Sequence, residues 1–261
     1  MTSISSFVPA CSAEEVVRVY GRGDAEVRAL DGVSVAFEGG RFTAIMGPSG
    51  SGKSTLMHAL AGLDGVDSGR VTLHGDRHRL DVEISSAPDA VLTELRRDRI
   101  GFVFQAFNLL PVLTARDNIL LPMRLAGTRP SPDWFDEVTG RLGLTDRLDH
   151  LPHEMSGGQQ QRVAVARALL PQPDVIFADE PTGNLDSHAG AEVLSMLRSS
   201  VRETGQTVVM VTHDPVAASY SDRVVLLADG RLVGEITDPT TDSVMNAMRD
   251  LRPSGSAVPV R

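Results

Sequence analysis

Residues 47–55 read Gly47-Pro48-Ser49-Gly50-Ser51-Gly52-Lys53-Ser54-Thr55, a complete G-x-x-x-x-G-K-[S/T] pattern. The apolar segment 42–46 before it is typical of a buried strand, and segment 56–61 after it has a helical composition. Such a glycine-rich turn lets backbone N–H groups and the positive end of a helix surround phosphate groups. In that setting Lys53 reaches the β- and γ-phosphates, and the Ser54 hydroxyl ligates Mg²⁺. An ordinary Gly/Ser turn is disfavoured because strand, loop and helix all agree, so the stretch predicts a nucleoside triphosphate site.

The overall composition limits which functions this stretch can serve. The chain has 261 residues, enough for one large domain with its own core. Its formal net charge of -9 repels a phosphate backbone, which disfavours nucleic acid as the main partner. Cys11 is the only cysteine, so no internal disulfide is expected. No run approaches about eighteen apolar residues, and we therefore expect any action on a membrane to require a partner.

Strand and helix signals alternate along most of the chain. Short apolar runs predict strands, and apolar residues at helical spacing predict helices. This alternation predicts an α/β fold with a largely parallel sheet, from which the block 113–148 departs as a helical excursion. We expect residues 1–13 to form a disordered N-terminus and residues 251–261 a mobile C-terminal tail. The predicted strands are 16–20, 33–37, 42–46, 71–74, 100–104, 174–178, 207–211 and 223–227. The other predicted helices are 88–97, 156–169 and one between the strands 174–178 and 207–211.

Two adjacent carboxylates follow the apolar run 174–178. Asp179 and Glu180 come directly after this predicted buried strand. Ligands of open α/β sheets bind at the carboxyl ends of the strands, so both side chains are expected beside the phosphate loop. In that position Asp179 would hold Mg²⁺, and Glu180 would activate the attacking water as a general base. A solvated strand end is the alternative for this pair, and the upstream phosphate loop favours the metal site.

A second glycine-containing helix start occurs at residues 155–160, which read Met-Ser-Gly-Gly-Gln-Gln. Ser156 can cap the following helix, and Gly157 and Gly158 let an anion approach the backbone closely. An ordinary helix cap is the alternative. The functional interpretation is a second phosphate-binding site that has no lysine or carboxylate of its own.

These motifs together resemble those of the ATP-binding cassette (ABC) ATPases. Residues 156–159 and the helix that follows are similar to the family signature, with Met155 in place of the usual Leu, a substitution that conserves volume. The other family motifs occur in the expected order over residues 14–250. They are Tyr20 as the aromatic residue against adenine, Gln105 as the Q-loop, Asn184-Leu185-Asp186 as the D-loop and His213 as the switch histidine. For Tyr20, a core tyrosine at a strand end is the alternative.

The resemblance implies a fold and a set of roles. The expected fold is an ABC-type P-loop NTPase, a single domain over 14–250, whose RecA-like core sheet carries an antiparallel β subdomain and a helical subdomain inserted at about 106–165. The expected cofactors are ATP and Mg²⁺. Catalytic roles fall to Glu180, His213 and Gln105, and metal binding to Ser54, Gln105 and Asp179. The expected nucleotide contacts are Tyr20, Gly47, Pro48, Ser49, Gly50, Ser51, Gly52, Lys53, Ser54, Thr55, Ser156, Gly157, Gly158, Gln159 and Asp186.

The resemblance also implies partners. In this family two cassettes pack head to tail, and each ATP lies between the phosphate loop of one and the signature of the other. Ser156, Gly157 and Gly158 would therefore contact the γ-phosphate of the partner's ATP, and Asp186 would couple the two sites. A chain with one cassette then forms a homodimer or a heterodimer with a related chain.

Within the family, two segments resemble the lipoprotein-release, macrolide-export and FtsE-like branch: 101–111, with the apolar stretch Phe107–Pro111, and 181–186. This branch implies a cassette at the cytoplasmic face of the inner membrane, driving a separately encoded permease with few spans and a large extracytoplasmic domain. The stretch 107–111 would receive a coupling helix of that permease, with core packing as the alternative. Export or transmembrane mechanotransmission is the expected function. The alternatives are an FtsE-like regulator of cell-wall hydrolysis without a transported substrate and an amino-acid importer subunit; action on DNA or ribosomes is disfavoured.

Overall fold

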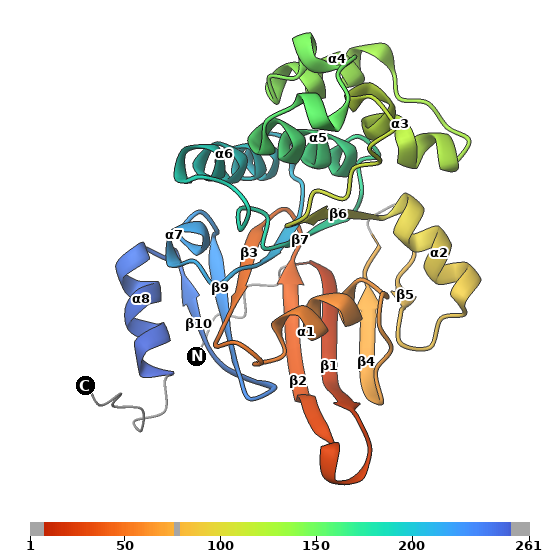
Figure 1. Ribbon diagram of the computed structural model, residues 1–261. Helices are drawn as coiled ribbons and strands as arrows, with labels where there is room; N and C mark the ends of the chain where they lie inside the picture. The colour runs from red at the N-terminus through yellow and green to blue at the C-terminus, as the bar shows by residue number, and fades with distance from the viewer. Residues whose placement is uncertain (1–7, 76–78, 252–261) are drawn as a thin grey trace.

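A six-stranded sheet lies at the centre of the computed structural model, which describes residues 8–75 and 79–251 (Figure 1). Five of its strands run parallel, and β10 joins one edge in the antiparallel direction. The predicted parallel α/β core is therefore confirmed. In spatial order the strands are β10 (Arg231–Thr237), β9 (Arg223–Ala228), β3 (Phe42–Met46), β8 (Val208–Val211), β7 (Val175–Asp179) and β6 (Ile100–Phe104).

A second sheet of four antiparallel strands packs below the first, as the predicted β subdomain requires. Its longest strands, β1 and β2, are paired along nearly their whole length. In spatial order its strands are β2 (Val27–Glu38), β1 (Pro9–Tyr20), β4 (Ser68–Leu73) and β5 (Val82–Glu83).

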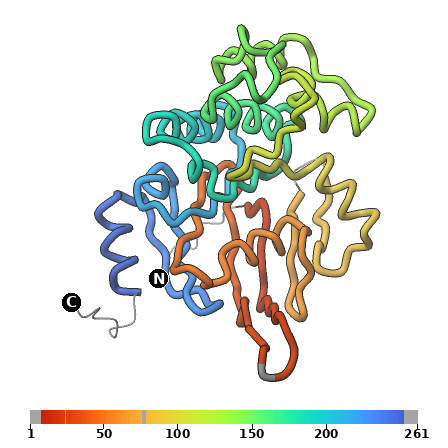
Figure 2. The backbone as a smooth tube through the Cα atoms, in the orientation of Figure 1, coloured from red at the N-terminus to blue at the C-terminus, as the bar shows by residue number. Residues whose placement is uncertain are grey.

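Helices cover both faces of the central sheet, and each face has its own hydrophobic core. Along β7, Ile176 and Ala178 point into the core shared with α3, α4, α5 and α6, whereas Val175 and Phe177 point into the core shared with α1 and the antiparallel sheet. Figures 1 and 2 show these two layers on opposite sides of the sheet. The helices are α1 (Lys53–Leu60), α2 (Asp89–Asp98), α3 (Ala115–Leu125), α4 (Pro132–Arg141), α5 (Gly157–Leu169), α6 (Ser187–Thr204), α7 (Pro215–Ala218) and α8 (Thr241–Asp250), with short 3-10 turns at Gly23–Ala25, Thr145–Arg147 and Pro152–Glu154.

The N-terminal prediction is wrong for residues 9–13. β1 begins at Pro9 and lies between β2 and β4, so hydrogen bonds hold it on both edges. Cys11 is fully buried in this strand, and burial raises the pKa of its thiol far above the usual value. Sequence analysis missed this part of the strand because residues 9–13 have short side chains. Residues 1–7, and residues 252–261 of the predicted tail, lie outside the described residues.

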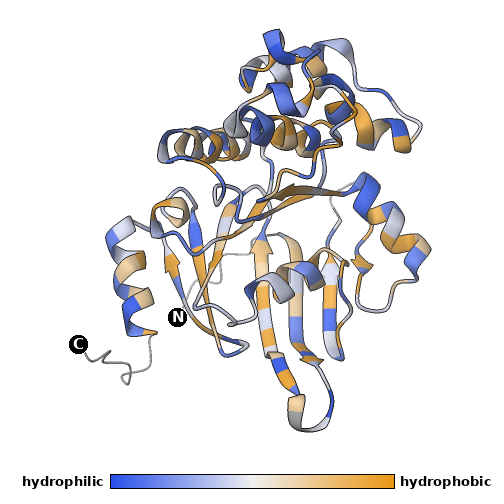
Figure 3. Cartoon of the chain, viewed as in Figure 1, coloured by the Kyte–Doolittle hydropathy of each residue, from blue (hydrophilic) through white to orange (hydrophobic). Residues whose placement is uncertain are grey.

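Two elements near the C-terminus were not predicted. β10 alternates between half-buried and exposed residues at the sheet edge, so it lacks the continuous apolar run that marks the central strands. Helix α8 follows, with Val244 buried in the core on the α3–α6 side. Hydrophilic and hydrophobic residues alternate along this helix in Figure 3. Within residues 8–75 and 79–251, no helix combines the length and the apolar character needed to cross a bilayer.

Candidate functional site

Four neighbouring strands of the central sheet end at one edge and bring the predicted catalytic side chains there. Parallel pairing aligns Phe104 with Asp179, Asp179 with Val211, and Val211 with Ile45. The residues that directly follow these positions therefore lie in a row: Gln105 after β6, Glu180 after β7, the turn to His213 after β8, and the phosphate loop after β3. This is the edge at which open α/β sheets bind ligands.

The phosphate loop connects β3 to α1 as predicted. Gly52 is the N-cap of α1 and has a φ of 97°, which a residue with a Cβ rarely adopts. Lys53 begins the helix, and its ammonium group donates to the carbonyl oxygens of Gly47 at 3.0 Å and Pro48 at 2.8 Å. The Lys53 side chain therefore links two backbone carbonyl groups at the start of the phosphate loop. Burial lowers the pKa of Lys53, while the charges of Glu180 and Asp179 oppose that change.

This loop fits a triphosphate. The N–H groups of the first turn of α1 have no intrahelical acceptor, and no side chain caps them. The buried Ser51 hydroxyl has no hydrogen-bond partner among the described residues. A Cβ on Gly50 would meet open space, so this side of the loop is free for a ligand. Donors without acceptors beside the half-buried ammonium group of Lys53 are the features that a bound polyphosphate requires.

The two carboxylates at the end of β7 lie in different environments. Burial raises the pKa of Asp179, and the nearby Glu180 adds to this effect, whereas His58 and Lys53 lower it. Glu180 has a φ of 46°, and its backbone N–H donates to Val211 O at 2.9 Å. This left-handed conformation turns its side chain toward β8, where Oε1 lies 2.8 Å from His213 Nδ1. A cation beside Asp179 would compensate for the burial of its charge.

Mg²⁺ fits this edge only as a shared site. Among residues 8–75 and 79–251, no group of three or more His, Cys, Asp or Glu side chains could hold a metal by itself. Mg²⁺ commonly takes one or two protein oxygens together with substrate phosphates and water. The exposed Ser54 in the first turn of α1, Gln105 and Asp179 supply oxygens of the required kind.

Gln105 is held by Asn184, a partner that sequence analysis placed only in the D-loop motif. Gln105 Nε2 donates to Asn184 Oδ1 at 3.1 Å, and Asn184 Nδ2 donates to Gln105 O at 3.0 Å. Gly183 lies against the same side chain, since a Cβ there would come within 2.7 Å of Gln105 Nε2. The segment after β7 therefore fixes the residue after β6.

Tyr20 lies at the end of β1, beside the loop that follows α1. Its hydroxyl donates to Asp64, and the guanidinium carbon of Arg18 lies 4.8 Å from its ring centroid. Arg18 also pairs with Asp64 at 2.7 Å. Tyr20 is 40% exposed, and its contacts with Arg18 and Asp64 hold the ring in place. Sequence analysis missed Asp64 because no local pattern links the end of β1 to the end of α1.

The second predicted phosphate site lies on the other side of the sheet. Ser156 and Gln159 form a capping box at the start of α5, in which Ser156 Oγ accepts from Gln159 N and Gln159 Oε1 accepts from Ser156 N. Ser156 is exposed, whereas Gly158 is buried against α6. Helix α5 belongs to the core opposite to that of α1. The two predicted phosphate sites of one chain thus lie at helices that pack on opposite sides of the sheet.

Asp186 is exposed at the N-terminus of α6. Its carboxylate accepts from His188 N and Ala189 N, both at 3.0 Å. The bond from Ala189 is the main reason why the pKa of Asp186 lies below its usual value. The charged carboxylate is therefore a fixed feature of this surface.

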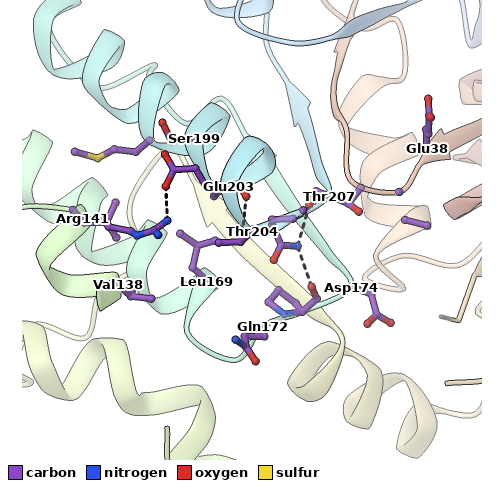
Figure 4. Close-up of a pocket in the computed structure, with 18 of the residues that line it drawn as sticks. Glu38, Val138, Arg141, Leu169, Gln172, Asp174, Ser199, Glu203, Thr204 and Thr207 are labelled. Carbon is purple, nitrogen blue, oxygen red and sulfur yellow. Dashed lines mark hydrogen bonds and ion pairs between the residues drawn. The ribbon is translucent and has the colours of Figure 1, made fainter. Parts of the chain in front are cut away.

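A cavity of about 990 Å³ lies apart from the residues discussed above, between α4, α6 and the segment before β7 (Figure 4). Arg141 crosses it to pair with Glu203 at 2.6 Å, and Gln206 donates to Pro173 O at 2.9 Å. None of the predicted nucleotide residues lines this cavity. Among the described residues, no buried side-chain nitrogen or oxygen that lacks a hydrogen-bond partner belongs to this lining, so nothing in it points to a ligand.

Comparison with known proteins agrees with these motifs. Residues 30–183 match the family model described as ABC transporter. YxdL of Bacillus subtilis, an ABC transporter ATP-binding protein, is 44% identical over 218 residues, which cover 82% of each chain. The macrolide export ATP-binding/permease protein MacB of Hyphomonas neptunium is 43% identical over 230 residues, which cover 87% of this chain. The chain spans only 34% of the length of that MacB.

Solved structures agree as well. The dimeric structure of MJ0796, described as a bacterial ABC transporter cassette, has a TM-score of 0.77 at 38% identity and covers 88% of this chain and 99% of that one. A dimeric post-hydrolysis state of MJ0796, bound to ADP and phosphate, has a TM-score of 0.76 with the same identity and coverage. With the family model matched over residues 30–183 and YxdL matched over most of its length, the chain belongs to the ABC transporter family, as one of its ATP-binding ATPase cassettes.

Proposed function

We propose that this chain hydrolyses ATP as a dimer at the cytoplasmic face of the inner membrane. The proposed work is to drive a separately encoded permease, with few spans and a large extracytoplasmic domain, for export or transmembrane mechanotransmission. One observation carries the catalytic part: a single sheet edge gathers the phosphate loop, Asp179, Glu180, Gln105 and His213. Similarity to YxdL and MacB supports the transport part.

In the proposed reaction, Lys53 exchanges its loop carbonyl contacts for phosphate oxygens of ATP. Glu180 takes a proton from the attacking water, and His213 orients that carboxylate through their hydrogen bond. Ser54, Asp179 and Gln105 would hold Mg²⁺, which supplies positive charge at the β- and γ-phosphates when bound. The exposed side chain of Tyr20 would pack against adenine.

A dimer would use the second phosphate site. Ser156, Gly157 and Gly158 begin a helix that packs on the opposite side of the sheet from α1, so they suit the γ-phosphate of an ATP held by another chain. The dimeric structures of MJ0796 support this arrangement. Both a homodimer and a heterodimer with a related cassette satisfy it.

Exposed apolar side chains support the permease contact. Leu110 is 44% and Val112 is 82% exposed, while Leu109 packs on the core. Core packing therefore accounts for only part of the apolar stretch 107–111. The buried Asn118 fixes this loop by bonding to Leu110 N and O and to two further carbonyl groups. A rigid loop with outward apolar side chains suits a short helix of a membrane partner.

Lys53→Ala tests the nucleotide site. Removing the ammonium group should weaken ATP binding by about 10-fold or more, since hydrogen bonds to charged groups contribute about 1.5–3 kcal/mol each. Equilibrium titration with a fluorescent ATP analogue measures the change. Arg231→Ala, which removes an exposed cation on β10 paired with Asp31, is the matched control and should bind like the parent. Equal affinities for the Lys53 variant and the parent would contradict the assignment.

Affinity purification of the tagged chain tests the permease. Solubilised membranes with Mg-ATP and a hydrolysis-deficient variant should yield a co-purifying protein with few predicted spans and a large external domain. A charge substitution, Val112→Asp, should abolish its recovery because it places a carboxylate in the proposed apolar contact. Recovery of a many-spanned importer subunit would overturn the choice of branch. A dimer recovered free of any membrane protein would overturn the transport function.

A further inference from the structure

Two residues with left-handed backbone conformations lie shortly after Gln105, which itself follows β6. Phe107 has a φ of 61° and Asn108 a φ of 51°, so both lie in the left-handed region. This region is unfavourable for residues with a Cβ, and especially for a bulky one such as Phe. Two such residues in succession persist only where surrounding contacts hold them.

Arg167 of α5 provides those contacts. Its Nη1 donates to Asn108 O at 2.5 Å, and its Nη2 donates to Phe107 O at 2.8 Å. The planar fork of a guanidinium suits two adjacent carbonyl groups, which a lysine could not bind in the same way. Within the described part of the chain, no carboxylate forms an ion pair with Arg167, and burial lowers its pKa. The guanidinium group of Arg167 therefore bonds to the turn at Phe107 and Asn108 instead of to a carboxylate.

A second α5 side chain holds the other flank of Gln105. The fully buried Gln161 donates through Nε2 to Phe104 O at 3.2 Å and to Pro181 O at 2.5 Å. Two α5 side chains therefore hold the backbone on both sides of Gln105: Gln161 bonds before it, and Arg167 bonds after it. The position of Gln105 thus depends on the position of this helix.

The strained turn also reaches the start of α5. A Cβ on Gly157 would lie 3.7 Å from Cζ of the Phe107 ring and 3.5 Å from Leu185. Phe107 thus contacts α5 at two places: its ring lies near Gly157 at the helix start, and its carbonyl oxygen accepts from Arg167. These two α5 residues are ten positions apart, about 15 Å at 1.5 Å per residue.

We propose that Arg167 is a positioning residue that ties Gln105 to the helix start at Ser156–Gly158 through the turn at Phe107 and Asn108. The inference rests on the proposed dimeric ATPase and deepens it. Gln105 serves the chain's own ATP, and Ser156 serves the ATP of the partner. Arg167 therefore links the two ATP sites of the dimer, so that γ-phosphate contact at one sets the geometry at the other.

Arg167→Gln in the full chain tests this link. The affinity for a fluorescent ATP analogue should stay within about 2-fold of the parent, because the phosphate loop lies on the other side of the sheet. The turnover number should fall on the order of 10- to 10²-fold, as for other displacements of catalytic groups. The Hill coefficient for ATP should fall toward one. Arg162→Gln, which removes an α5 arginine paired with Glu192 at 3.1 Å, is the matched control and should hydrolyse ATP like the parent.

A second substitution distinguishes positioning from general damage. Asn108→Gly in the Arg167→Gln background should restore part of the turnover, because glycine adopts a positive φ without strain. If Arg167→Gln does not fold, Arg167→Lys with and without Asn108→Gly makes the same comparison. Unchanged turnover and cooperativity, or a loss that Arg162→Gln reproduces and Asn108→Gly does not relieve, would overturn the role of Arg167. Absence of hydrolysis in the parent would instead overturn the proposed function.

Discussion

Replacing Glu180 with Gln is expected to lower ATP turnover by about 10²–10⁴-fold while ATP binding stays intact. Glu180 Oε1 lies 2.8 Å from His213 Nδ1 at the sheet edge that holds the phosphate loop. A glutamine keeps the length of the side chain and can still bond to His213, but it cannot take a proton from water. Phosphate release, measured beside binding of a fluorescent ATP analogue, separates catalysis from affinity.

The same variant is expected to accumulate as an ATP-bound dimer, because ATP still binds between the two chains while its hydrolysis is blocked. Light scattering after size exclusion in Mg-ATP measures this population. Glu203→Gln is the matched control, since Glu203 is an exposed carboxylate paired with Arg141 across the remote cavity. It should hydrolyse ATP and elute like the parent. Turnover of Glu180→Gln within about 10-fold of the parent would remove the general-base role from this residue.

The sheet edge was predictable because its residues follow strands that are visible in the sequence. Gln105, Asp179, Glu180 and His213 each stand one or two positions beyond an apolar run, and parallel strands end at a common edge. The order of the strands is not encoded in any local pattern. It became evident only from the pairing of β8 between β3 and β7.

The contacts that hold the site in place could not be predicted in the same way. Arg167 and Asn108 are 59 positions apart, and Tyr20 and Asp64 are 44 apart. Each contact joins a loop or strand end to the end of a helix, where periodicity carries no information. The left-handed conformation of Phe107 also runs against residue preference, so it depends on tertiary contacts. The sequence thus indicates which residues are candidates for the site, and long-range packing contacts determine how their side chains are oriented.

Gly52→Ala is expected to lower the melting temperature of the nucleotide-free chain by at least about 6 °C. The φ of 97° at this position disfavours any residue with a Cβ, at about 1–3 kcal/mol. A Cβ would also lie 2.2 Å from the backbone oxygen of Ala29 in β2, whose neighbours Arg28 and Leu30 are both paired with β1 and limit its movement. Together these effects should exceed about 3 kcal/mol, and a chain of this size loses about 2–4 °C for each kcal/mol.

Gly50→Ala separates steric conflict from backbone strain, since both glycines belong to the same loop. Gly50 also has a positive φ, 77°, but a Cβ there would meet nothing within 4 Å. We therefore expect a loss of about 1–2 kcal/mol from conformation alone. Differential scanning calorimetry without nucleotide compares the two variants directly. If both lose the same stability, the close approach of β2 to the phosphate loop does not constrain Gly52, and the loop's shape is maintained by backbone conformation alone.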